Sequence, residues 1–97
     1  MKVIGMCTFQ DENCKVSLGS YDNRRPALRL FDEDDLPMAT ATINLPEEPL
    51  GENQVIIKSY SENAGMDDAL MNAGIISAPI KYVQLNYGEV SVHELLV

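Results

Sequence analysis

The stretch KSYSENAGMDDALMNAGII, residues 58–76, is the part of this 97-residue chain that has the periodicity of a helix. Four apolar residues follow one another at i, i+3, i+4 and i+7 and share one face: Met66, Ala69, Leu70 and Ala73. Ser61 or Asn63 is expected to cap the start, and Gly74 stands where a left-handed residue ends many helices. The stretch predicts a core-packed helix of about ten residues, rather than a catalytic segment.

The rest of the chain has the pattern of short strands that are separated by Gly, Pro, Asn and Asp turns. In residues 38–45 the alternation is regular, since Ala39, Ala41, Ile43 and Leu45 fall on one face of an extended chain. The expected strands are residues 2–9, 14–20, 27–31, 38–45, 54–58, 80–87 and 90–97.

Strands and helices do not alternate in this order, so a parallel doubly wound sheet is excluded in favour of the α+β class. We expect a curved antiparallel sheet of about seven strands with one short helix packed on it. A chain of 97 residues has room for one core, and residues 1–97 are predicted to be a single globular domain.

Charge is the strongest compositional signal. Fifteen acidic residues against seven basic ones give a net charge of −8. Such a field repels phosphate backbones, which argues against direct nucleic-acid binding and favours either solubility alone or a basic protein partner. No apolar run reaches the roughly 20 residues of a membrane span, and the N-terminus lacks the pattern of a secretory signal, so a cytoplasmic location is expected.

Sequence motifs for catalysis or cofactor binding are missing. The one histidine, His93, is expected to be a half-exposed structural residue at a strand end. The acidic run FDEDDLP resembles a calcium loop, but an EF-hand that starts at Asp32 would need Gly and Glu where Pro37 and Ile43 stand. We therefore predict a protein that is not an enzyme, with no catalytic, cofactor-binding or metal site.

Two cysteines and three arginines have local interpretations. A turn near residues 10–11 would place Cys7 and Cys14 opposite one another, close enough for a disulfide, although buried free thiols are favoured in a cytoplasmic protein. The arginines are expected to pair with neighbouring acids, with phosphate or carboxylate binding as the alternative. These residues are Arg24, Arg25 and Arg29, beside Asp22 and residues 32–35.

Two stretches, RPALRLFDEDDLPM and ATINLPEEPLGENQVIIKSYSENAGMDDALMNAGII, carry a further pattern. NLPEEPL at residues 44–50, YSENAGM at 60–66 and AGI at 73–75 resemble a family of small bacterial proteins, a domain of unknown function often found on phages and conjugative elements. The resemblance covers about half of the chain. It implies a mobile-element context and no particular reaction.

Three functional hypotheses follow. The first is a non-enzymatic accessory protein of mobile-element type, a counter-defence inhibitor that presents carboxylates to a basic protein surface. Its predicted contact residues are Asp32, Glu33, Asp34, Asp35, Glu47, Glu48, Asp67 and Asp68. The second is a self-assembling structural protein, a homo-oligomer formed through edge strands such as residues 90–97. A hydrolytic or metal-dependent enzyme is the weakest of the three.

Overall fold

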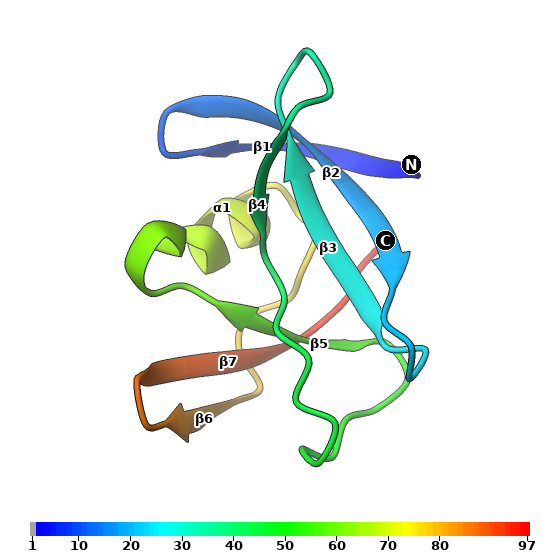
Figure 1. Cartoon of the computed structure of the whole chain (residues 1–97), viewed down its shortest axis with the longest axis vertical. Helices are drawn as coiled ribbons and strands as arrows, with labels where there is room; N and C mark the ends of the chain where they lie inside the picture. Colours follow the sequence, from blue (N-terminus) through cyan, green and yellow to red (C-terminus); the bar gives the residue numbers. More distant parts are fainter. Residues whose placement is uncertain (1) are drawn as a thin grey trace.

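The computed structural model describes residues 2–97, in which one short α-helix packs against antiparallel strands (Figure 1). The elements are β1 (Val3–Phe9), β2 (Glu12–Ser20), β3 (Pro26–Phe31), β4 (Pro37–Thr40), β5 (Gln54–Lys58), the 3₁₀ helix η1 (Ser61–Asn63), α1 (Met66–Asn72), β6 (Lys81–Leu85) and β7 (Gly88–Glu94). Every strand pair is antiparallel. The predicted α+β class is confirmed.

The strands divide between two sheets, so the prediction of a single curved sheet is wrong. One sheet has the order β1-β2-β3-β4 and the other has the order β5-β7-β6. The chain passes from the first to the second just after β4. The N–H of Ala41 donates to the carbonyl of Leu28 in β3, whereas its carbonyl accepts from the N–H of Lys58 in β5. Ala41 therefore marks the corner at which the chain leaves the first sheet and joins the second.

This crossing also explains why the regular strand predicted for residues 38–45 is short. β4 ends at Thr40, and the only further ladder contact in this stretch is an isolated bridge between Thr42 and Ile57 of β5. The alternating pattern was therefore correct for an extended chain, but the pattern does not show which sheet each residue joins. The two sheets share this one extended segment as a corner.

The main core lies between the sheets and α1, which packs against β1 and β5. Val16, Leu28 and Leu30 enter it from the four-stranded sheet, and Leu70 enters it from the helix. A second, smaller cluster covers the other face of the three-stranded sheet. Its buried members are Ile56, Val90 and Val92, and it is completed by half-buried residues that include Ile43, Leu45 and Leu50 from the loop after β4.

The helix is shorter than predicted and begins differently. α1 has seven residues, and its N-cap is Gly65 in the left-handed region, with φ of 86°. Neither Ser61 nor Asn63 caps it. The hydroxyl of Ser59 instead accepts a hydrogen bond from the Asp67 N–H at 3.0 Å, from outside the helix. The predicted left-handed exit at Gly74, with φ of 73°, is confirmed.

Asn63 does not cap the helix, but its buried side chain links three elements of the fold. Its side-chain amide donates to the carbonyls of Thr40 at 2.8 Å and of Lys58 at 3.3 Å, so it joins η1 to the ends of β4 and β5. From the other side, the amide of Gln10 donates to the carbonyls of Glu62 and Ala64. The YSENAGM stretch thus has a structural explanation, because its polar residues hold the chain between the sheets.

The prediction that residues 90–97 form an edge strand is wrong. β7 is the central strand of its sheet, since Val92 pairs with Ile56 of β5 and Val90 pairs with Val83 of β6. The free edge of this sheet is on β6, whose only strand partner is β7. Within residues 2–97, no helix has the length and hydrophobicity that crossing a membrane would need.

Candidate binding site: an acidic hollow between two turns

The eight predicted contact residues lie in three separate places rather than on one surface (Figure 1). The four acids of residues 32–35 form the turn between β3 and β4, at the top of Figure 1. Glu47 and Glu48 belong to the loop between β4 and β5, which is at the bottom. Asp67 and Asp68 are in the first turn of α1. A single continuous acidic face is therefore not formed.

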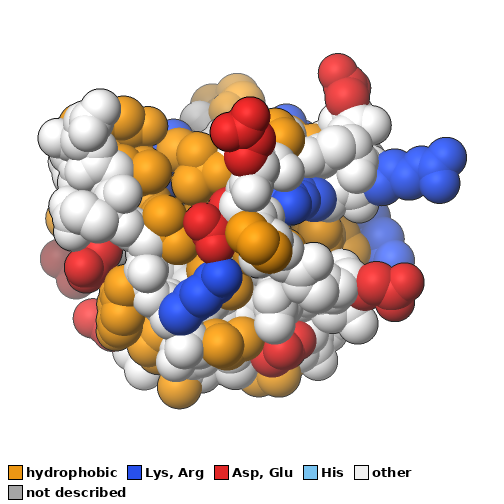
Figure 2. Space-filling model, turned by 90° about the horizontal axis from the view of Figure 1, so that it is seen from below, with side chains coloured by type: hydrophobic (Ala, Val, Ile, Leu, Met, Phe, Trp, Pro, Cys, Tyr) orange, Lys and Arg blue, Asp and Glu red, His pale blue; other side chains and the backbone are white. Residues whose placement is uncertain are grey.

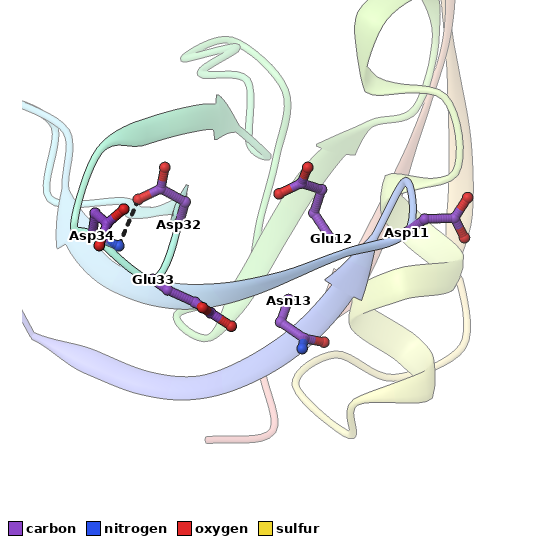
Figure 3. Close-up of a pocket in the computed structure, with 6 residues that line it drawn as sticks. All are labelled: Asp11, Glu12, Asn13, Asp32, Glu33 and Asp34. Carbon is purple, nitrogen blue, oxygen red and sulfur yellow. Dashed lines mark hydrogen bonds between the residues drawn. The ribbon is translucent and has the colours of Figure 1, made fainter.

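The turn after β3 has acidic neighbours in the β1–β2 hairpin that are not among the predicted contact residues. β2 pairs with β3 so that Lys15 lies opposite Phe31. The residues before Lys15 therefore lie beside the residues after Phe31. A hollow of about 340 Å³ results (Figure 3), lined by Asp11, Glu12, Asn13, Asp32, Glu33 and Asp34. We call these six residues the acidic hollow.

The conformation of the β3–β4 turn depends on Asp32. One oxygen of its carboxylate accepts hydrogen bonds from the N–H groups of Asp34 at 2.8 Å and Leu36 at 2.9 Å. The backbone closes with bonds between Asp32 and Asp35 and between Asp32 and Leu36. Asp35 has φ of 64°, a conformation that Asp tolerates better than most residues. The carboxylate of Asp32 is therefore mainly structural.

The opposite wall is the tight turn between β1 and β2. Phe9 pairs with Glu12, and the two residues between them, Gln10 and Asp11, have φ of 49° and 64°. Two consecutive left-handed residues define the turn type that suits the twist of a two-residue hairpin. The turn directs the chain back so that Glu12 and Asn13 lie beside the β3–β4 turn, with their side chains on opposite sides of β2, as Figure 3 shows.

Lys15 is the basic residue that pairs with an acid beside the hollow. Lys15 Nζ lies 2.7 Å from the carboxylate of Asp35, and this hydrogen bond raises the pKa of Lys15. The side chains of Glu12, Glu33 and Asp34 are exposed and form no ion pair with any residue in 2–97. The hollow therefore keeps a strong negative charge in water.

The carboxylates of the hollow do not converge as metal ligands do. Within the described part of the chain, no three or more His, Cys, Asp or Glu side chains are placed to hold one ion. The walls come from two separate turns and leave a space between them. Such an arrangement suits a larger cationic group, which several carboxylates can contact from different sides.

Of the four other predicted acids, Glu48 and Asp67 have partners, whereas Glu47 and Asp68 are exposed and form no ion pair within residues 2–97. Glu48 forms an ion pair with Lys81 at 2.7 Å. Asp67 accepts the N–H of Asp68 and is half-buried, so only Asp68 presents a free, exposed carboxylate at this helix end. Figure 2 views the end of the molecule opposite the hollow, where acidic and basic side chains are scattered among hydrophobic ones.

The predicted pairing of the arginines with nearby acids is wrong for the described residues, whose ion pairs both involve lysine. The guanidinium of Arg25 donates instead to three backbone carbonyls, those of Leu45 at 2.7 Å, Pro46 at 3.3 Å and Glu48 at 2.6 Å. Arg25 therefore holds the NLPEEPL loop against the turn after β2. Arg24 and Arg29 are exposed.

His93 is fully buried, not half-exposed as predicted. Its Nδ1 lies 2.8 Å from the carbonyl oxygen of Ser77, which can only accept, so Nδ1 carries the proton. Its Nε2 then accepts from the hydroxyl of Ser91 at 2.7 Å. Ser91 is only 5% exposed, so this hydroxyl is out of reach of a substrate in solution. The pair fastens β7 to the segment before β6.

Comparison with known proteins adds no relative. No family model, no curated protein and no solved structure matches this chain. The resemblance to the mobile-element family stays a prediction, and the acidic hollow is the feature of the structure that bears on function.

Proposed function

We propose that this chain is a small, non-enzymatic binding protein whose acidic hollow receives basic side chains of a protein partner. The single observation that carries the proposal is the meeting of two turns that are far apart in sequence, with acids on both walls. One ion pair, between Lys15 and Asp35, lies at the edge of this region, and the lining acids form no ion pair with any lysine or arginine of residues 2–97.

The physical chemistry favours arginine or lysine as the bound group. A guanidinium carries five donors in a plane and can bond to carboxylates on two sides at once. The walls of the hollow offer acceptors from Glu12 on one side and from Glu33 and Asp34 on the other. Because these side chains are exposed, each contact contributes modestly, about 0.5–1 kcal/mol, and its strength falls with added salt.

The biological context is also part of the proposal. The resemblance to a mobile-element family supports an accessory or counter-defence role in the cytoplasm, in which the carboxylates imitate the phosphates that a basic protein surface normally binds. The net charge of −8 supports this choice of partner over a nucleic acid. The NLPEEPL and YSENAGM stretches then serve the fold through Arg25 and Asn63, and the contact surface lies elsewhere.

The test uses a labelled oligo-arginine peptide and two variants with the same net charge. The hollow variant carries Glu12→Gln, Glu33→Gln and Asp34→Asn. The control variant also loses three exposed carboxylates, all outside the hollow: Asp22→Asn, Glu52→Gln and Glu89→Gln. Fluorescence anisotropy at low salt should show affinity reduced about 10- to 100-fold in the hollow variant and little changed in the control.

The same measurement at about 0.5 M salt should abolish most binding by the wild type, because exposed charges are screened there. Equal losses in the two variants would mean that net charge alone attracts the peptide, and the proposal would be wrong. A pull-down from a host lysate with both variants as bait then identifies the natural partner as a protein that only the hollow variant fails to retain.

A second function, self-association, is favoured by the surface of β6. This strand is an edge, and three large apolar side chains on or beside it are exposed: Ile80 by 49%, Tyr82 by 59% and Tyr87 by 65%. An uncovered edge with such side chains can pair with another copy of the chain. Sedimentation at increasing concentration tests this, and a monomer throughout the micromolar range excludes it.

A further inference from the structure

Cys7 and Cys14 face each other across the hairpin that forms one wall of the acidic hollow. They are Cα partners in the β1–β2 ladder, and both are free. The predicted opposition of the two cysteines, and their burial as thiols, are thus confirmed. Directly opposite residues in an antiparallel pair have Cα atoms about 4.5 or 5.5 Å apart, and both values fall within the roughly 4.4–6.8 Å range of disulfides.

The two thiols differ in their surroundings. Cys14 is completely buried, with its sulfur 3.4 Å from the sulfur of Met38. Cys7 is 6% exposed and lies on the wall of a surface hollow of about 240 Å³ between β1 and α1. The lining residues are Met6, Cys7, Thr8, Ala69, Asn72 and Ala73. Cys7 borders a hollow that is open to solvent and is therefore the thiol that a reagent meets first, whereas Cys14 has no exposed surface.

We propose that Cys7 and Cys14 form a reversible intrachain disulfide when the protein meets a low-molecular-weight disulfide such as oxidised glutathione. The thiolate of Cys7 attacks one glutathione sulfur, which forms a mixed disulfide and releases one glutathione thiolate. The thiolate of Cys14 then attacks the Cys7 sulfur and releases the second glutathione. The protein loses two protons and two electrons, and one glutathione disulfide becomes two thiols.

This bond would close the segment that contains the β1–β2 turn. Asp11, Glu12 and Asn13, which form one wall of the acidic hollow, all lie between the two cysteines. Cross-linking limits the conformations open to the unfolded chain and restrains this turn in the folded protein. Oxidation should therefore raise the melting temperature, by roughly 5–15 °C for a loop and a domain of this size.

The environment also determines the rate. Burial, together with the neighbouring Cys14, raises the pKa of Cys7 to about 11. Since the thiolate is the reactive form, only a small fraction of Cys7 reacts near neutral pH. Oxidation should then be slow at neutral pH and become up to about tenfold faster with each added pH unit below that pKa. The disulfide between Cys7 and Cys14 should therefore form under sustained oxidation and not during a brief oxidative pulse.

The experiment incubates the folded, reduced protein with oxidised glutathione, then unfolds it in urea that contains iodoacetamide so that every remaining free thiol is blocked, and measures intact mass. Wild type should end about 2 Da below the reduced mass with no alkyl group added. Cys14→Ala should stop as a glutathione adduct on Cys7, and Cys7→Ala should remain unmodified. Thermal melts of the oxidised and reduced wild type test the predicted shift and do not depend on either variant.

Two results would overturn the proposal. One is a lasting glutathione adduct on wild-type Cys7 while Cys14 still accepts an alkyl group. The other is two alkylated cysteines after the folded protein has been incubated with oxidised glutathione under conditions that oxidise the same chain in urea. Oxidation can change oligo-arginine binding only if the proposed function of the acidic hollow is correct, so that effect rests on the proposed function. Loss of that binding in both redox states would contradict the proposed function and leave the mass result standing.

Discussion

Replacing Arg25 tests whether one side chain holds the NLPEEPL loop in place. Arg25 follows the turn after β2, whereas its three carbonyl partners are about twenty residues further along the chain. Arg25→Met keeps much of the apolar stem and removes every donor. Arg25→Lys keeps the charge but replaces the planar fork with a single ammonium group, which cannot reach carbonyls spread along a loop in the same way.

The magnitude follows from the geometry. Two of the three bonds, to Leu45 at 2.7 Å and to Glu48 at 2.6 Å, are short and partly buried, and the bond to Pro46 at 3.3 Å is long and exposed. A hydrogen bond with a charged donor contributes about 1.5–3 kcal/mol, less where water can replace it. Arg25→Met should therefore reduce the free energy of unfolding by about 2–3 kcal/mol, and Arg25→Lys should lie between Arg25→Met and wild type.

Urea denaturation followed by circular dichroism measures this directly, with Arg29→Met as the matched control. Arg29 is exposed on β3, and no hydrogen bond or ion pair of its side chain is found within the described residues, so its loss should change stability by less than about 0.5 kcal/mol. If Arg25→Met and Arg29→Met have the same unfolding free energy within error, the loop does not depend on Arg25 and the reasoning is refuted.

Two further predictions concern buried groups. Asn63→Ala should reduce the free energy of unfolding in urea by about 1–3 kcal/mol, because the carbonyls of Thr40 and Lys58 lose their donor. Asn63→Asp should reduce it further, because a carboxylate would face two acceptors. Equal stability of wild type and both variants would contradict this account. The folded-state pKa of Cys7, about 11, is above its ordinary value of 9.0, so between these values the folded state keeps a proton that the unfolded state loses. The stability linked to this proton, about 2–3 kcal/mol, is present below pH 9 and is lost as pH rises through 11. The difference in unfolding free energy between wild type and Cys7→Ala should shrink over that interval, and a difference that does not change with pH would contradict it.

Local patterns predicted the kind of element correctly where local forces decide it. The apolar stripe of α1 is buried at Met66, Ala69 and Leu70, and Gly74 has the left-handed backbone expected at the helix end. The start of the same helix was misjudged. The N–H of Asp67 in its first turn bonds to Ser59, which lies eight positions earlier and outside the range of local capping patterns. The intervening 3₁₀ turn places it there.

In the candidate site, too, some features follow from local sequence patterns and others depend on tertiary contacts. The acidic turn of residues 32–35 is visible in the sequence, and so is the QDEN turn at residues 10–13. Their meeting was open to prediction, since consecutive antiparallel strands bring alternate turns to one end of a sheet. Asp67 and Glu48 were misjudged for another reason. The charge of Glu48 is satisfied by the ammonium of Lys81, which only the folded chain brings near, whereas Asp67 accepts a hydrogen bond from the N–H of the next residue, Asp68.

The sequence by itself determined the strand and helix segments, the turns and the excess of negative charge, because backbone preference, side-chain periodicity and ionisation act over a few residues. Only the tertiary structure decided that residues 41–43 divide the strands between two sheets and that Arg25 donates to carbonyls instead of pairing with carboxylates. Both outcomes depend on which hydrogen-bond partner each polar group finds among all the groups that folding brings within reach. These partners are distant in sequence, so no local pattern indicates them.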